Sequence, residues 1–143
     1  MRVFIDTNLW VYRLDHREPG KCDFVKDWLR GVAEDHDIVI STQVLIELRS
    51  VLTRKLDPAL SWSDTRAALE ALSEFEVVPT NTDLVLDAHE LSKTEQLSWF
   101  DALIAEAAIR SGCSVLYSED LDHGQRFGDL TVHNPFQGIG VEV

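Results

Sequence analysis

The sequence predicts an α/β fold in three layers, with a mostly parallel sheet of four or five strands flanked by helices. Two observations lead to this prediction. Short apolar runs recur along the 143-residue chain, and longer amphipathic stretches with a helical pattern follow each of the first three; such alternation of strand and helix is typical of a parallel sheet. The runs also do not alternate with polar residues, which indicates strands buried on both faces.

Five apolar runs are the predicted strands. The first four are continuous, and the fifth is weaker because Thr131 interrupts it. In chain order they cover residues 3–5, 38–40, 77–78, 115–117 and 130–132.

The stretches around these runs are the predicted helices. They cover residues 8–14, 21–34, 43–56, 62–74, 82–96 and 99–111. The last of them ends at Gly112, because a glycine commonly follows the final turn of a helix. The chain contains no internal repeat and no Gly/Ser linker, so we expect one domain over residues 1–143. The segment Gly138-Ile139-Gly140 predicts a flexible or loosely docked tail.

Composition excludes several classes of protein. Hydrophobic residues make up 45% and charged residues 27% of the chain, which is typical of a globular domain and not of a disordered one. No stretch approaches the roughly 20 apolar residues of a membrane span, and Asp6 interrupts the first apolar run before a signal peptide could form. We therefore expect a cytoplasmic protein without a membrane segment. Cys22 and Cys113 belong to no C-x-x-C motif, which predicts buried thiols and no zinc site.

The charge of the chain is strongly acidic and unevenly distributed. The formal net charge is −12. Residues 1–66 contain ten basic and eleven acidic side chains, whereas residues 67–143 contain three basic and fourteen acidic ones. Because a polyanion is repelled by net negative charge, a nucleic acid would have to approach through the first half of the chain or across a bound cation.

Two acids follow predicted strands directly. Asp6 ends the first strand, where it could be the N-cap of the next helix or part of a site. Asp120 lies in the segment Ser118-Glu119-Asp120 after the fourth strand, which could also be a solvated acidic loop. The carboxyl ends of parallel strands meet at one edge of a sheet, where ligands usually bind.

Two further acids lie on predicted helices. Glu47 borders the apolar stripe of the helix after the second strand, and pairing with Arg54 is the alternative to a role in a site. Asp101 faces the core side of the last helix, where an ionised carboxylate needs a partner or a metal ion. A capping box with Ser98 would also explain Asp101, so both interpretations are open.

Convergence of these four acids would require a cation. Two carboxylates about 4 Å apart repel each other by about 4 kcal/mol at an effective dielectric constant of 20. Carboxylate oxygens, with no cysteine or histidine at ligand spacing, suit Mg²⁺ or Mn²⁺ better than Zn²⁺. Such ions activate water for phosphodiester hydrolysis.

Four segments, taken in their order along the chain, together resemble the motifs of a known protein family. They are Val3-Phe4-Ile5-Asp6-Thr7-Asn8, the segment from Ser41 to Leu48 that contains Glu47, Trp99-Phe100-Asp101-Ala102-Leu103-Ile104, and Leu116-Tyr117-Ser118-Glu119-Asp120-Leu121. With them the chain resembles the PIN-domain nucleases, and among these the VapC-type toxins of toxin–antitoxin pairs, over essentially its whole length. The resemblance implies a three-layer PIN-like domain.

The same resemblance implies a function and a set of site residues. It implies a Mg²⁺- or Mn²⁺-dependent endoribonuclease in which Asp6, Glu47, Asp101 and Asp120 are the metal-binding and catalytic acids. Thr7, Asn8 and Ser118 match polar positions beside these acids, and Asp122 is a further candidate. The family also implies a homodimer, and a small antitoxin whose tail covers the active site, where a basic residue would complement the acids.

Basic residues of the first half are candidates for contacts with the RNA backbone. They are Arg13, Arg17, Lys21, Arg49, Arg54 and Lys55. For any one of them, a solubilising role at the surface is the alternative.

Other functions fit the sequence less well. A phosphatase of the haloacid dehalogenase type needs a second aspartate two residues after the first, and position 8 is Asn. A receiver domain needs a lysine after a late strand, and the last lysine is Lys93. No G-x-x-x-x-G-K or G-x-G-x-x-G motif occurs. The remaining alternative is a PIN-like module that binds RNA or protein with little catalytic turnover.

Overall fold

The computed structural model describes residues 1–137, and the predicted tail at residues 138–140 lies outside them. The strands form one six-stranded sheet in the order β3-β2-β1-β4-β6-β5, in which only the β5–β6 pair is antiparallel. The strands are β1 (Arg2–Ile5), β2 (Asp37–Ser41), β3 (Glu76–Val78), β4 (Val115–Tyr117), β5 (Arg126–Phe127) and β6 (Leu130–His133). The predicted mostly parallel sheet is confirmed.

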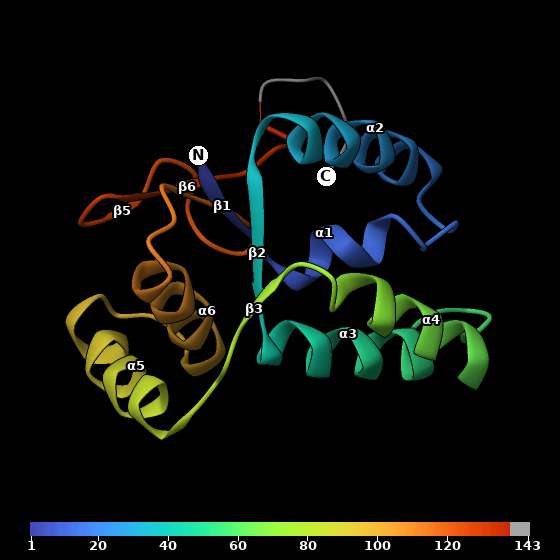
Figure 1. Cartoon of the computed structure of the whole chain (residues 1–143). Coiled ribbons are helices and arrows are strands. Elements are labelled where there is room, and N and C mark those ends of the chain that lie inside the picture. The colour runs from blue at the N-terminus through green and yellow to red at the C-terminus, as the bar shows by residue number, and fades with distance from the viewer. Residues whose placement is uncertain (138–143) are drawn as a thin grey trace.

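Helices cover both faces of the sheet. They are α1 (Thr7–Tyr12), α2 (Pro19–Asp35), α3 (Thr42–Arg54), α4 (Trp62–Leu72), α5 (Thr82–Thr94) and α6 (Trp99–Arg110). Figure 1 shows α5 and α6 side by side on one side of β2, and α1 and α2 on the other, while α3 continues from the end of β2 and lies next to α4. The predicted three-layer α/β architecture is therefore confirmed.

Polar side chains fix where most helices begin. The N-cap side chains of α1, α3, α4, α5 and α6 each accept a hydrogen bond from a backbone N–H of the first turn, which satisfies one of the donors that a helix leaves unpaired there. These N-caps are Asp6, Ser41, Ser61, Asn81 and Ser98. Helix α2 begins instead with Pro19, a residue well suited to a first helical position.

The strand β5 corrects the predicted count of four or five strands. It contains only Arg126 and Phe127 and pairs with the start of β6 across a tight turn. Gly128 in that turn has a φ of 62°, a backbone conformation that glycine adopts without strain. A two-residue strand produces no apolar run, so the strand prediction missed it; the pair Gly128-Asp129 was the available signal.

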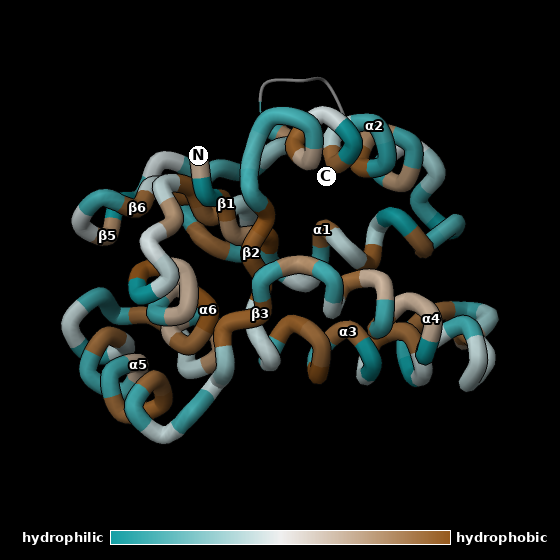
Figure 2. Tube along the Cα trace, viewed as in Figure 1, coloured by the Kyte–Doolittle hydropathy of each residue, from teal (hydrophilic) through white to brown (hydrophobic). Residues whose placement is uncertain are grey.

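The core lies on both faces of the central strands. Val3, Phe4 and Ile5 of β1, together with Val39 and Ile40 of β2, are fully buried. Figure 2 shows these strands as mainly hydrophobic, whereas hydrophilic and hydrophobic residues are mixed along α2 and α5. Burial on both faces explains why the strands read as continuous apolar runs.

Both cysteines are buried, as predicted, and both are free thiols. Among residues 1–137, no helix has both the length and the apolar composition needed to cross a membrane.

Candidate active site

The carboxyl edge of the sheet brings the predicted acids toward one another. Strand β1 lies between β2 and β4, and all three run parallel. Asp6 directly follows β1, and its backbone N–H donates to the carbonyl of Tyr117 at the end of β4, 3.0 Å away. The segment containing Asp120 continues from β4, and α3, which carries Glu47, begins where β2 ends. The topology therefore assembles the site from segments far apart in the sequence.

Asp6 is buried, with 5% of its surface exposed. Its Oδ1 accepts from the Thr7 backbone N–H at 2.7 Å, and its Oδ2 accepts from the Ser118 hydroxyl at 2.8 Å. The first bond makes Asp6 the N-cap of α1, and the second links it to the segment after β4. The two interpretations of Asp6 are therefore compatible, because one carboxylate caps the helix and also lies among the other acids.

Burial raises the pKa of Asp6 from its ordinary 3.8 to about 7. Desolvation is the main cause, because it disfavours the charged form. The hydrogen bonds from Ser118 and Thr7 oppose the rise, while repulsion from Asp120 and Glu47 adds to it. The electrostatics of the site thus favour either a proton or a positive ion at Asp6.

The buried carboxyl group of Asp6 should make the stability of the fold depend on pH. The folded state holds the Asp6 proton more tightly than the unfolded chain does, so the stabilisation is present at about pH 4 and is lost as the pH rises through about 7. Between these two pH values, the contribution of Asp6 to the free energy of unfolding falls by at most about 4 kcal/mol. Urea unfolding in EDTA should therefore show lower stability at pH 8 than at pH 5. The Asp6→Asn variant should lack this part of the dependence, and identical profiles for the two proteins would contradict the assignment.

Glu47 is half-buried and is held by two neighbours. Its Oε1 accepts from the Gln43 amide at 3.0 Å and from the Thr7 hydroxyl at 3.4 Å. Burial raises the pKa of Glu47, the two hydrogen bonds oppose this, and repulsion from Asp120 and Asp101 adds to the rise. Among the residues described, Glu47 forms no ion pair with Arg54, so it faces the acids instead.

Asp120 is exposed and is also held by polar neighbours. The Asn8 amide donates to its Oδ2 at 2.9 Å, and its backbone N–H donates to the Ser118 hydroxyl at 3.1 Å. Desolvation and repulsion from Asp101 and Glu119 raise its pKa. The predicted polar neighbours thus all contact the acids: Asn8 bonds one of them, and Thr7 and Ser118 bond two each.

Asp101 completes the group from the first turn of α6. The Ser98 hydroxyl accepts from the Asp101 backbone N–H at 3.3 Å, which is one half of the capping box. The reciprocal bond, from the Ser98 N–H to the Asp101 carboxylate, is absent from the described part of the chain. The carboxylate raises the pKa of both Glu47 and Asp120, so it lies on the side of the site and is not consumed by capping.

The donor set of this site suits a hard divalent cation. All four acids offer carboxylate oxygens, the ligands that Mg²⁺ and Mn²⁺ prefer. Within residues 1–137, however, no three Asp, Glu, His or Cys side chains are already arranged to hold a metal ion. Binding an ion would therefore need side-chain rotations that bring the oxygens together, which mutual repulsion opposes until positive charge arrives.

Two interactions beside the acids have no counterpart in the sequence prediction. Gln43 contacts Glu47, as described above. Lys21, only 8% exposed, lies 3.6 Å from the carboxylate of Glu119 and donates to the Tyr12 hydroxyl at 3.1 Å, and Tyr12 in turn donates to Glu119. These contacts anchor the segment that carries Asp120 to α1 and α2. Their partners come from distant parts of the chain, so no local sequence signal marks them.

Within residues 1–137, the other predicted residues of the first half and Asp122 form no hydrogen bond or ion pair with the four acids. Asp122 is exposed, and its carboxylate makes no hydrogen bond or ion pair with any residue that the structure describes. Lys21 is buried as described above, Arg17 pairs with Asp15 at 2.9 Å, and Arg13 is half-buried with its guanidinium 5.6 Å from the centre of the Trp10 ring. These arrangements leave less of their charge available to RNA than a free surface side chain would offer.

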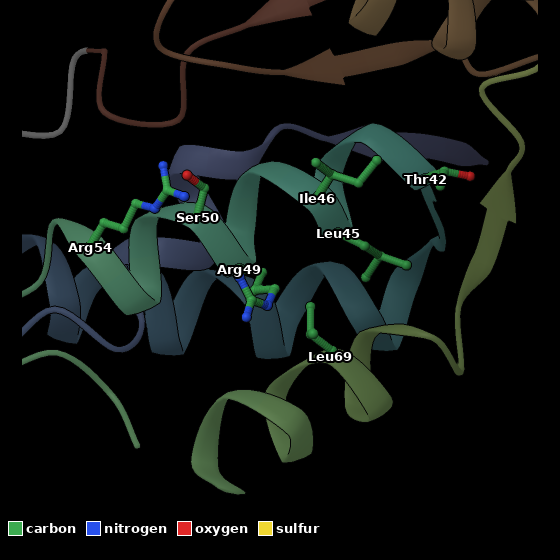
Figure 3. Close-up of a pocket in the computed structure, with 7 residues that line it drawn as sticks. All are labelled: Thr42, Leu45, Ile46, Arg49, Ser50, Arg54 and Leu69. Atoms are coloured by element: carbon green, nitrogen blue, oxygen red, sulfur yellow. The ribbon is translucent and has the colours of Figure 1, made fainter. Parts of the chain in front are cut away.

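The basic residues of α3, together with Lys55 at its C-cap, fit the prediction of an RNA contact better. Arg49, Arg54 and Lys55 are exposed. Arg49 and Arg54 also line a cavity of about 470 Å³ between α3 and α4, whose apolar wall is formed by Leu45, Ile46 and Leu69 (Figure 3). None of the four acids lines this cavity, but Glu47 belongs to the same helix.

Solved structures with the same fold include several toxin–antitoxin proteins. VapBC2 from Rickettsia felis, solved bound to a DNA fragment from its promoter, has a TM-score of 0.67 and 23% identity, covering 94% of this chain and 98% of that one. VapC20 of Mycobacterium tuberculosis, described as a sarcin-ricin loop cleaving toxin, has a TM-score of 0.64 and 22% identity, covering 84% and 91%. VapBC-1 of nontypeable Haemophilus influenzae has a TM-score of 0.64 and 20% identity, covering 94% and 98%.

The sequence comparisons identify the family. No curated protein was found to match the chain. The family model of the PIN domain matches residues 3–127, a range that includes β1 except Arg2, β2 to β5, helices α1 to α6 and all four acids. The chain therefore belongs to the PIN domain family.

Proposed function

We propose that this PIN domain is a metal-dependent endoribonuclease and the toxin of a VapBC-type toxin–antitoxin pair. The observation that carries the proposal is the group of four acids at the carboxyl edge of the sheet, where repulsion from neighbouring acids helps to raise the pKa of Asp6, Glu47 and Asp120. Such crowding of like charges is unfavourable for folding alone. A cation bound among the acids would offset this repulsion, and nucleases of the PIN family generally use a divalent metal ion.

Asp6 and Asp101 would hold Mg²⁺ or Mn²⁺, with Glu47 binding directly or through water and Asp120 completing the site. A divalent ion supplies activation of water and charge stabilisation for phosphodiester hydrolysis. The chain itself orients the acids: Ser118 holds Asp6, Thr7 holds Glu47, and Asn8 holds Asp120. Hydrogen bonds to metal ligands orient them and strengthen ion binding, and these three bonds would do so once the carboxylates have turned toward the ion.

RNA would bind across the acids toward the exposed cations of α3. Arg49 and Arg54 lie on the helix that carries Glu47, so a strand placed over the acids could reach them with its phosphates. Contacts to phosphates position a nucleic acid without selecting its sequence. With a net charge of −12, these local cations and the bound metal would offset the repulsion of the rest of the chain.

The toxin role rests on the shared fold of the VapBC structures, which contain a VapB antitoxin. An antitoxin for this chain would place a basic side chain at the acidic site, where charge complementarity favours it. A homodimer acting in the cytoplasm completes the proposal.

One observation favours a second candidate, a PIN-like module that binds RNA or protein with little turnover. The acids are not already arranged as a set of three metal ligands in residues 1–137. A module of this kind would keep the fold and its acidic edge without needing the ion.

Metal titration with a labelled RNA panel separates the two candidates. We expect cleavage that requires Mn²⁺ or Mg²⁺ and disappears in EDTA. Without RNA, millimolar Mn²⁺ should raise the melting temperature, because a ligand that binds only the folded state stabilises it. Binding of RNA that is indifferent to metal, with no cleavage and no thermal shift, would establish the module instead.

A further inference from the structure

Gln43 makes an unusual set of contacts beside the proposed site. It is the second residue of α3, and only 6% of its surface is exposed. Its side-chain amide nitrogen donates to Glu47 Oε1 at 3.0 Å and to the backbone carbonyl of Phe100 at 3.2 Å. One amide group thus joins a carboxylate of α3 to the first turn of α6.

The orientation of this amide is determined by its partners. A carboxylate oxygen and a carbonyl oxygen both accept hydrogen bonds, so the NH₂ group must face them and Oε1 must point elsewhere. Oε1 is buried and finds no hydrogen-bond partner in the described part of the chain. A buried acceptor without a partner costs free energy, and an apolar side chain of similar length would avoid that cost.

The second contact places Gln43 beside another acid of the site. Phe100 immediately precedes Asp101 on α6, and its carbonyl lies in the same turn. Gln43 therefore holds the Glu47 carboxylate directly and links it to the turn that carries Asp101. The bond to Thr7 is longer, at 3.4 Å, so Gln43 is the stronger of the two restraints on Glu47.

We propose that Gln43 is a positioning residue of the nuclease site, which sets the direction of the Glu47 carboxylate and its separation from Asp101. The inference rests on the proposed metal-dependent function. Gln43 touches neither the substrate nor the reacting atoms in this scheme. It acts through Glu47, as residues that hydrogen-bond to metal ligands do.

The test compares Mn²⁺ binding by Gln43→Met and by the wild-type protein, measured by calorimetry without RNA. Methionine has a similar length and lacks both donors. We expect the dissociation constant for Mn²⁺ to rise by about 10- to 100-fold, as for other partners of metal ligands. The melting temperature in EDTA should stay within a few degrees of wild type, because losing the unpaired oxygen offsets the lost hydrogen bonds.

A double-variant cycle shows whether Gln43 acts through Glu47. In a Glu47→Gln background, Gln43→Met should change Mn²⁺ binding little further, since coupled residues are not additive. Thr65→Val is the matched control, because Thr65 is 4% exposed, its hydroxyl is buried without a partner in residues 1–137, and it lies on α4. The control should leave Mn²⁺ binding unchanged.

Three results would overturn the inference about Gln43. The first is wild-type Mn²⁺ affinity in Gln43→Met. The second is an equal loss of affinity with and without Glu47. The third is a Gln43→Met protein that unfolds far below wild type in EDTA, which would show a structural role. A wild-type protein that binds no Mn²⁺ would overturn the proposed metal-dependent function together with this inference, so the two failures are distinguishable.

Discussion

Asp6→Asn is expected to lose RNA cleavage by more than about a hundredfold and yet to unfold at a higher temperature than wild type at pH 8 without metal. Replacing a residue that only hydrogen-bonds to a metal ligand lowers activity by about 10- to 100-fold. The loss should be larger here, because Asp6 would itself bind the ion. The gain in stability arises because Asp6 is buried with a pKa of about 7, so the wild-type protein must hold an unfavourable charge at pH 8. Asparagine remains a good N-cap for α1.

The measurements are a cleavage assay in Mn²⁺ and thermal unfolding in EDTA. Asp129→Asn is the control, because Asp129 is an exposed acid in the turn between β5 and β6 and its substitution removes one negative charge far from Asp6 in sequence. That control should retain wild-type cleavage. An Asp6→Asn protein that is less stable than wild type at pH 8 would show that capping and hydrogen bonding outweigh the cost of the buried charge.

Lys21→Met is expected to lower the free energy of unfolding by about 3 kcal/mol, the scale seen when one partner of a buried ion pair is removed. The side chains of Lys21 and Glu119 are only 9% and 16% exposed, so the remaining Glu119 charge would have little water to stabilise it. The ammonium group also lies 4.5 Å from the centre of the Tyr12 ring, and this cation–π contact would be lost too.

Urea unfolding of Lys21→Met and Lys26→Met provides the comparison. Lys26 is exposed on the same helix, so its substitution should change stability by less than about 0.5 kcal/mol. The double variant Lys21→Met/Glu119→Gln should recover part of the loss, because no unpaired charge remains. Equal stability of the two single variants would mean that the Lys21–Glu119 contact contributes nothing.

Most of the fold was predictable because its signals are local. Apolar runs buried on both faces located β1, β2 and β4, and three of the helices begin at the predicted residue. Helix α1 starts one residue earlier than predicted because Asp6 is the N-cap. The two-residue strand β5 was missed because its pairing depends on a turn and on a neighbouring strand, neither of which leaves an apolar pattern.

For the candidate site, the sequence predicts where the acids lie on the sheet but not the hydrogen-bond partners that surround them. Asp6 and Asp120 follow strands, so the rule for parallel sheets places them at one edge. The role of Gln43 depends on the Phe100 carbonyl, 57 residues away, and the burial of Lys21 depends on Glu119, near the end of β4. Each of these contacts joins segments far apart in the sequence, so a pattern along the chain cannot reveal it.

The two ends of the sheet are short strands, β3 with three residues and β5 with two. An outermost strand exposes unpaired backbone groups that can recruit another chain, and brevity limits how much such a partner could gain. At the β3 end, Glu76 also carries a charge paired with Arg2. A protein built this way should resist aggregation by strand addition when it accumulates in large amounts.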